Sequence, residues 1–475
     1  MEGGKEDGRE NEFIRSLAHY ASCFTFYCAT FHTSLTQKET KVNATQHLKN
    51  DMLEAGEGIV DITPPLGIEL AGYHRQPGNE RLITRIRQPT STRALVLRLK
   101  AVETAIVSIE VGAVSRDFVK RVQARVANQV EFPAENVRIC VTHTHSMPTL
   151  RYLRQWGAIP QRPYIDALEN SVVQAVEFVK KDLAPTDLYV GKAHAVGGNF
   201  NRTSETWKTD ELFTKTSTDK ERWLDTMLHV LHFHQGEPKR GLLWYHFSAH
   251  PVCHGDGNAG PDWPGTVSEQ TRSGDGLAPA FLQGHCGDVN PGDGTPPWRG
   301  GDPEKVSVSI YAALHRALDH ANRVKVSELR ISSADIEVPL DIKLLKAQLA
   351  RYKENPSQCA SGEWVDSRFA QDWFEGAKRW DLQQTSYITP ISVTQLGEVG
   401  LLFHPAELYS YYGLEIRRDS PFENTLVFGY TDDFIGYLTD PNAYETSEYA
   451  AIVVPKITDL PPFTSEGCAS FYHGG

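Results

Sequence analysis

The sequence predicts a mixed α/β fold with layered sheets and helices. Two observations lead to this fold class. Apolar runs of strand length alternate with amphipathic helical segments from about residue 56 onward. The order of these segments lacks the strict βαβ repeat of a doubly wound parallel sheet. With 475 residues, the chain is also long enough to bury a large core.

The first half of this region is expected to contain several strands and two helices. A helix near 117–126 follows from apolar residues at helical spacing, and a longer one at 163–183 has a continuous apolar face and a proline at its start. A short strand is expected at the start of 58–67, and further strands are expected at 92–99 paired with 104–112, and at 136–146, 188–197, 227–234 and 241–250.

In the second half, residues 255–302 are rich in Gly, Pro and Asp and are predicted to form a long functional loop region. Beyond this loop the expected elements are a helix at 306–324, a strand at 328–340, helical structure at 343–380, a hairpin at 392–405 and a helix at 406–419.

Residues 1–55 are polar, and we expect them to lie outside the fold as a disordered or mis-started segment, with one large domain at 56–475. The apolar stretch 13–35 is interrupted by Arg15, His19 and His32 and follows acidic residues, so no signal peptide or membrane span is predicted. The compartment and the oligomeric state stay open.

Composition excludes some function classes. A net charge of −12 without any basic run argues against nucleic acid as a partner. Seven cysteines without regular spacing do not form a disulfide framework, and we expect Cys140, Cys253 and Cys286 to be buried thiols.

The pair His143 and His145 closes the strand that ends in ICVTHTHS. Residues i and i+2 of a strand face the same side, so both histidines are expected on the face of Val137, Ile139 and Val141. The pair fits two metal ligands, or one ligand with an acid or base, or two hydrogen-bonded core histidines.

Three further polar residues follow apolar runs at distant positions. His250 ends YHFSAH, Glu407 follows VGLLF and is expected to begin a helix, and Tyr437 lies in a segment rich in aromatic residues. Taken singly, Glu407 fits an ordinary first-turn helix residue and Tyr437 a packing residue. Two histidines, a carboxylate and one more donor together are what a hydrolytic zinc site needs.

An ordered set of motifs resembles the catalytic domain of neutral, non-lysosomal ceramidases and their bacterial relatives. The set covers about residues 56–455 in the family's order. The matching elements are DITPPLG with AGY, THTHS, GGNFNRT, FSAHP, DWPG, GDVNP, the strand before PAE, and GYTDDFIGYLTDPNAYETSEY.

The resemblance implies an α/β/β/α layered sandwich and a zinc ion, Zn(2+), held by His143, His250, Glu407 and Tyr437. It also implies that His145, Arg202 and Tyr449 lie beside the metal and grip the scissile amide and its oxyanion. Asn290 stands where the family's loop carries a serine that helps catalysis, so we do not expect a covalent serine route. Because the sequence ends at Gly475, we expect it to lack the additional C-terminal β-sandwich that the resemblance implies.

From these residues we expect a zinc-dependent amidohydrolase that uses a metal-activated water on an N-acyl amide, either a ceramide-like lipid or a smaller amide. The polar 255–302 loop suggests a wide, partly polar entrance and favours the smaller substrate. Two alternatives stay open, a zinc-retaining protein with a binding role and little activity, and a metal-dependent esterase.

Overall fold

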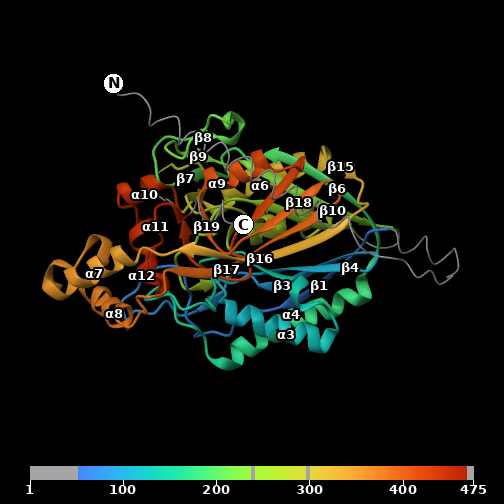
Figure 1. Cartoon of the computed structure of the whole chain (residues 1–475). Helices are drawn as coiled ribbons and strands as arrows, with labels where there is room; N and C mark the ends of the chain where they lie inside the picture. The colour runs from blue at the N-terminus through green and yellow to red at the C-terminus, as the bar shows by residue number, and fades with distance from the viewer. Residues whose placement is uncertain (1–51, 237–240, 296–299, 468–475) are drawn as a thin grey trace, which may run out of the picture.

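A curved nine-stranded sheet is the largest element of the computed structural model, which describes residues 52–236, 241–295 and 300–467 (Figure 1). Its strand order is β13-β11-β10-β6-β1-β3-β4-β5, with β15 pairing with β6. The strands are β1 (Glu54–Asp61), β3 (Ser91–Leu99), β4 (Val102–Ile109), β5 (Val137–Val141), β6 (Ala184–His194), β10 (Met227–Gln235), β11 (Gly241–Phe247), β13 (Ala280–Gln283) and β15 (Asn322–Val324).

The predicted mixed α/β fold class is confirmed, and the 92–99 and 104–112 segments pair antiparallel as β3 and β4. The predictions for residues 1–51 lie outside the described residues. β1 begins at Glu54, two residues before the predicted start of the domain. Among the described residues no helix has both the length and the apolar character needed to cross a membrane.

A second sheet of four strands, in the order β16-β17-β18-β20, packs against the first. Apolar side chains of both sheets form one cluster, which includes Leu97 and Phe233 from the large sheet and Leu401, Phe403 and Phe428 from the small one. Apolar residues alternate along these strands, and this alternation places them on one face of each sheet. The strands are β16 (Leu329–Pro339), β17 (Ser386–Leu396), β18 (Val399–Phe403) and β20 (Asn424–Phe428).

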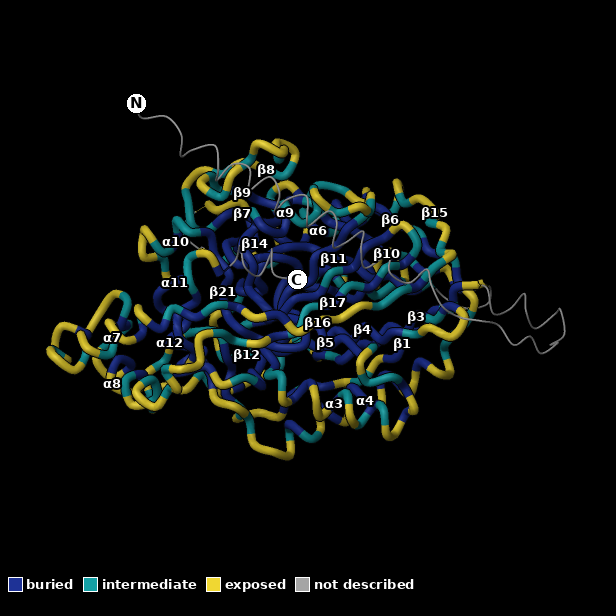
Figure 2. Tube along the Cα trace, in the orientation of Figure 1, coloured by how far each residue is buried: buried dark blue, intermediate teal, exposed yellow. Residues whose placement is uncertain are grey.

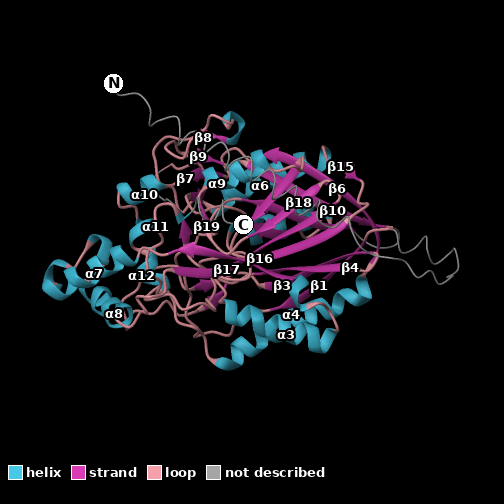
Figure 3. Cartoon of the chain, viewed as in Figure 1, coloured by secondary structure: helices cyan, strands magenta, loops and turns pink. Residues whose placement is uncertain are grey.

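Helices cover the outer face of the large sheet, as Figure 3 shows for α3 and α4. α4 (Arg162–Asp182) lies over β1 and β3 with α3 (Arg116–Val130) beside it, while α6 (Pro303–Asp319) lies over β6 and β10 with α5 (Trp263–Asp275) beside it. The predicted 163–183 helix is confirmed. The buried residues in Figure 2 accordingly concentrate in the sheets, and the exposed ones lie on outer helices and loops.

The predicted loop 255–302 is more ordered than expected, because it contains α5 and the short strands β12, β13 and β14. Its Asp, Pro and Gly residues serve as helix boundaries. The Asp262 side chain caps the first turn, Pro264 stands in that turn, and Gly276 ends the helix in the left-handed conformation. Trp263 and Val267 bury its inner face.

The remaining elements are short strands and the helices at the C-terminal end. The strands are β2 (Arg85–Ile86), β7 (Asn199–Asn201), β8 (Lys208–Thr209), β9 (Trp223–Leu224), β12 (Asn258–Ala259), β14 (Val289–Pro291), β19 (Glu407–Leu408) and β21 (Tyr437–Leu438). The helices are α7 (Ile342–Glu354), α8 (Ser367–Ala377), α9 (Ser410–Asp419), α10 (Pro441–Glu445), α11 (Tyr449–Ile452) and α12 (Val454–Thr458).

Candidate metal centre and its pocket

The His143 and His145 side chains meet, although not by strand alternation. β5 ends at Val141, and His143 adopts a left-handed backbone conformation with φ of 61°. This conformation is rare for a residue with a Cβ atom and is typical of functional turns. The turn brings the Nε2 atoms of the two rings to 3.3 Å from each other. The predicted proximity is therefore correct, while the strand register used to predict it is wrong.

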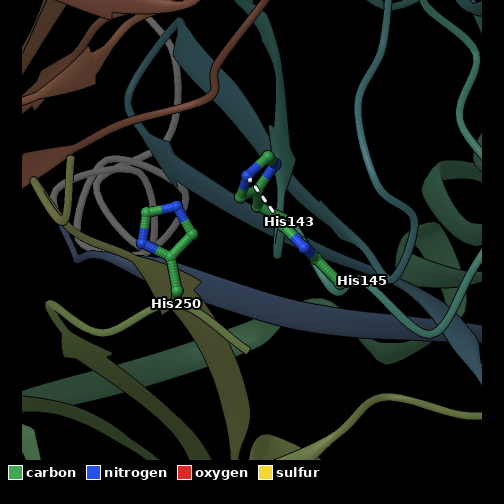
Figure 4. Close-up of side chains that lie close together, drawn as sticks. All are labelled: His143, His145 and His250. Atoms are coloured by element: carbon green, nitrogen blue, oxygen red, sulfur yellow. Dashed lines mark hydrogen bonds between the residues drawn. The ribbon is translucent and has the colours of Figure 1, made fainter. Parts of the chain in front are cut away.

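His250 joins this pair from the end of β11. Ligand atoms of His143, His145 and His250 all lie within 4.8 Å of one another, and Figure 4 shows the three rings gathered around one space. His143 and His250 are fully or nearly buried. Two of the four predicted ligands are thus close together, with the predicted neighbour His145 beside them.

Backbone carbonyls fix the orientation of two of these rings. The Nδ1 atom of His143 lies 2.7 Å from the carbonyl oxygen of Gly112, and that of His250 lies 2.9 Å from the carbonyl oxygen of Val289. A carbonyl only accepts, so each Nδ1 carries the hydrogen and donates it. In a neutral ring the Nε2 atom then carries the free lone pair, which is the arrangement found in metal-bound histidines.

Glu407 reaches the histidines from a strand and not from the predicted helix start. It lies in β19, which pairs in parallel with β21 so that Glu407 stands opposite Tyr437, while α9 begins only at Ser410. Gly287 permits this approach, because a Cβ atom there would lie 2.5 Å from the Glu407 carbonyl oxygen. Strand pairing therefore places the carboxylate and the tyrosine side by side.

The Glu407 carboxylate faces both ring nitrogens. Its Oε2 atom is 3.1 Å from Nε2 of His250 and 3.4 Å from Nε2 of His143. With both Nδ1 atoms protonated, neutral rings would point two lone pairs at a carboxylate oxygen, which repels them. A cation between these atoms resolves the conflict, and nitrogen and oxygen donors of this kind suit zinc. The residues present therefore fit a zinc ion.

Electrostatics keep the site ready to bind a cation. Burial, followed by the charge of Arg202, lowers the pKa of His250 to about 4, so the ring is neutral near pH 7. Burial, followed by the two neighbouring histidines, likewise holds the pKa of His145 well below its ordinary value.

Tyr437 and Asn290 are both hydrogen-bonded to Arg202. The guanidinium donates to the Tyr437 hydroxyl at 2.5 Å, to the Asn290 side-chain oxygen at 3.1 Å and to the Gly287 carbonyl at 2.9 Å. Tyr437 in turn stands opposite Glu407 in the β19–β21 strand pair. Burial raises the pKa of Tyr437, so without a bound cation it is a neutral phenol. All the predicted ligand residues are therefore adjacent.

The polar floor of a pocket of about 510 Å³ is formed by His143, His145, Arg202, Asn290, Glu407 and Tyr437, to which Tyr449 also contributes. Its wall is largely apolar and comes from Leu153, Trp156, Phe434, Val454 and Ile457. The 255–302 segment contributes only Asn290 and Gly300 to the described lining. The wide, partly polar entrance therefore stays a prediction, while the apolar wall comes from the loop after β5, from Phe434 and from α12.

Sequence reasoning missed several residues that shape the site. Tyr430 is buried, its ring stacks on His143 with centroids 4.3 Å apart, and its hydroxyl lies 3.4 Å from Glu407 and 3.1 Å from the Cys286 sulfur. Its position in an aromatic-rich segment was the only signal. Gly72 lies against the His145 ring, where a Cβ atom would be 2.3 Å from the ring. Trp156 carried no signal in the sequence.

Comparisons with known proteins point to one family. The protein-family model described as neutral/alkaline non-lysosomal ceramidase, N-terminal, matches residues 53–295. The neutral ceramidase structure from Pseudomonas aeruginosa has a TM-score of 0.67 and 18% identity, with 89% of this chain and 73% of that chain covered. The structure of a ceramidase complexed with C2 has a TM-score of 0.65 and 18% identity, with 89% and 74% covered. A search of curated proteins gave no match.

Proposed function

This chain belongs to the neutral/alkaline non-lysosomal ceramidase family, and we propose that it is a zinc-dependent amidohydrolase acting on an N-acyl amide. The range matched by the family model, 53–295, includes His143, His145, Arg202, His250 and Asn290. The similarity to the ceramidase structures extends to the fold as a whole. Membership of a ceramidase family supports hydrolysis of an amide bond.

One observation supports the metal ion in this proposal. The rings of His143 and His250, each oriented by a hydrogen bond from Nδ1, face Glu407. His143, His250 and Glu407 would hold the zinc, and Tyr437 would be the fourth protein ligand. When bound, zinc supplies Lewis-acid chemistry that lowers the pKa of a coordinated water towards neutrality. The cluster also offers a second ligand set, in which His145 would replace Glu407.

The other residues of the pocket floor have roles in the proposed reaction. Water adds to the amide carbonyl carbon, the C–N bond breaks, and a carboxylate and an amine result. Neutral His145 would take the proton of the water and give it to the departing nitrogen. Arg202 and Tyr449 would donate hydrogen bonds to the oxyanion, each typically worth about 3–4 kcal/mol when well placed.

Asn290 would orient Arg202 and not attack the substrate. Its side-chain oxygen accepts from the guanidinium at 3.1 Å, and an amide nitrogen is a poor nucleophile. We expect Asn290→Ala to reduce turnover without abolishing it, and no acyl group to be trapped on the protein. Asn290→Ser is the informative reverse change, because it restores the residue type that the resemblance implies at this position.

The apolar wall supports a substrate with an acyl chain. Leu153, Phe434 and Ile457 face the pocket whose floor carries the polar residues, which suits an acyl group bound beside the cleavage site. A ceramide-like lipid and a smaller amide both fit this description. A series of N-acyl amides with increasing chain length, compared in one detergent, would show whether catalytic efficiency rises with apolar contact.

The test of the proposed function is hydrolysis of matched amide, ester and phosphoester substrates with and without a chelator. We expect amide cleavage that is lost on chelation and restored by zinc, with about one zinc per chain. Cleavage of the ester alone would favour the esterase alternative. Bound zinc without turnover of any substrate would favour a binding role.

A further inference from the structure

The segment 250–254, which follows β11, forms one side of the metal centre. It contains His250, whose ring faces the other histidines. The Pro251 carbonyl of the same segment accepts a hydrogen bond from the His145 backbone at 3.1 Å. The position of this segment therefore affects where the His250 ring lies relative to the rest of the site.

Two consecutive residues at the start of α5 hold both ends of this segment. The Oδ1 atom of Asp262 accepts a hydrogen bond from the Cys253 backbone at 3.1 Å, and its Oδ2 atom accepts one from the His254 backbone at 3.0 Å. At the other end, the Trp263 indole donates to the His250 carbonyl at 3.1 Å. Asp262 is buried, so its bonds form in a low-dielectric interior, which strengthens them.

The backbone of Asp262 indicates a role beyond starting α5. Its φ of 67° and ψ of −152° lie in a region that glycine adopts readily and that other residues rarely adopt. Such strain persists only where surrounding contacts hold the residue in place, and it is concentrated at functional sites. A capping side chain ordinarily accepts from the second or third N–H of the helix, whereas Asp262 accepts from the first, that of Trp263, at 2.8 Å. Its bonds to the segment 250–254 account better than helix capping for an aspartate in this strained position.

We propose that Asp262 is a positioning residue that fixes the segment 250–254 and thereby holds His250 in place to bind the metal. The inference rests on the proposed function, which assigns His250 to the zinc site. Asp262 acts through the backbone of this segment and contacts neither the metal nor the substrate. An aspartate that only starts α5 would change the stability of the fold and leave the affinity for zinc unchanged, so the two roles predict different results.

The main test uses Asp262→Gly. Glycine adopts the observed φ without a Cβ penalty, so this change removes the carboxylate contacts without adding backbone strain. We expect the dissociation constant for zinc to rise about 10-fold or more, as is typical when a group supporting a metal ligand is lost. Competition with a chelator measures this constant in the folded protein and requires no turnover.

Asp341→Gly is the matched control, because it removes a capping carboxylate from another helix. The Oδ1 atom of Asp341 accepts a hydrogen bond from the Leu344 backbone at 2.7 Å at the start of α7, a helix that carries none of the metal-centre residues. Its zinc affinity should stay within about twofold of the wild type, since distant sites act independently. Equal losses of affinity in both variants, or an unchanged affinity in Asp262→Gly, would overturn the proposal.

Asp262→Asn is the conservative variant. It keeps the size of the side chain and one acceptor oxygen, while its amide nitrogen cannot accept a hydrogen bond. Its zinc affinity should therefore lie between those of the wild type and Asp262→Gly. If the glycine variant does not fold, the asparagine variant decides the question, and an affinity equal to that of the wild type would count against the proposal.

Hydrogen exchange of the metal-free protein tests the anchor by itself. The Cys253 and His254 amides should be protected in the wild type and in Asp341→Gly, and both should lose protection in Asp262→Gly. Protection that survives in Asp262→Gly would refute the anchor. If the wild type binds no zinc, the proposed function fails together with the metal role of Asp262, while the exchange result still shows whether Asp262 holds the segment.

Discussion

At the scale of single residues, the hydrogen bonds at Nδ1 indicate which histidine suits metal binding and which suits proton transfer. His143 and His250 both donate through Nδ1 to backbone carbonyls. The Nδ1 atom of His145 is buried and has no hydrogen-bond partner. Its ring is therefore not committed to one tautomer by a partner at that nitrogen, which suits proton transfer better than metal binding.

The first prediction separates the two candidate ligand sets. We expect His250→Ala to lose stoichiometric zinc, because the anchored Nε2 atom that faces Glu407 is removed. His145→Ala should retain about one zinc per chain and lose most turnover. Elemental analysis after dialysis measures the metal, and His254→Ala, which changes a nearby histidine outside the cluster, is the control. Equal loss of zinc in both variants would assign the three-histidine set instead.

The second prediction concerns Tyr430, whose hydroxyl contacts Glu407 while its ring stacks on His143. Tyr430→Phe keeps the stacked ring and removes only the hydroxyl. We expect zinc affinity to fall about 10–100-fold, as is typical when a residue supporting a metal ligand is lost. Competition with a chelator measures the affinity, and Tyr412→Phe serves as the control because its hydroxyl contacts Asp219 instead. Unchanged affinity would show that this contact does not support the carboxylate.

At the scale of elements, the segment 429–437 connects the two sides of the site. The Asp432 carboxylate accepts hydrogen bonds from the Ile139 backbone at 2.8 Å and from Arg138 at 2.6 Å, which ties this segment to β5. The same segment continues into β21 and places Tyr437 opposite Glu407. The positions of His143 and Tyr437 are therefore coupled through a buried ion pair.

The third prediction concerns α12, which contributes to the pocket wall and contains the buried Lys456. Its ammonium group donates to the Ile452 carbonyl at 2.7 Å and lies 5.0 Å from the centre of the Trp364 ring. Burial, partly offset by Glu363, lowers the pKa of Lys456 to about 8. The ordinary value in an unfolded chain is about 10.4.

The sign of the effect follows from these two values. Between about pH 8 and pH 10.4 the unfolded chain binds more protons at this residue than the folded chain. The contribution of Lys456 to the free energy of unfolding therefore rises with pH across this window. We expect the difference in free energy of unfolding between the wild type and Lys456→Met, measured by urea denaturation, to rise with pH across this window. The same difference for Lys378→Met, at an exposed position, should not change with pH. A flat Lys456 difference would mean that its pKa is not lowered.

At the scale of the whole molecule, the two sheets share one apolar core. Phe403 of β18 stacks on Phe428 with ring centroids 4.9 Å apart and lies in the same cluster as Leu97 and Phe233 of the large sheet. The apolar faces of the two sheets cover each other, so one cannot become exposed to water without the other. The catalytic floor depends on this packing, since the histidines follow strands of the large sheet and Glu407 follows β18 of the small one.

The fourth prediction is that both sheets unfold together. Phe403→Ala should lower the free energy of unfolding by about 3–5 kcal/mol, because it leaves a cavity in the shared core. Ile388→Ala, at a position 53% exposed on the same small sheet, should change it by less than about 0.5 kcal/mol. Urea denaturation followed by tryptophan fluorescence and far-ultraviolet circular dichroism should give coincident transitions. Two separate transitions would contradict a single core.

The sequence by itself determined the local elements and the chemical type of the site. Apolar spacing predicted the 163–183 helix and the β3–β4 pair, since side-chain periodicity reports which face of an element is buried. Polar residues after apolar runs identified His143, His250 and Glu407 as neighbours, because strand ends converge in a layered fold. The same reasoning placed Glu407 on a helix, which is wrong, because its backbone pairs with Tyr437 as a strand.

Only the tertiary structure decided how these residues face one another. The Nδ1 anchors, the contact of Tyr430 with Glu407 and the ring contact of Trp156 with Tyr449 join positions that are tens to hundreds of residues apart. Local periodicity contains no information about such partners. The apolar wall of the pocket has the same origin, because α12 and the loop after β5 meet only when the two sheets pack around their common core.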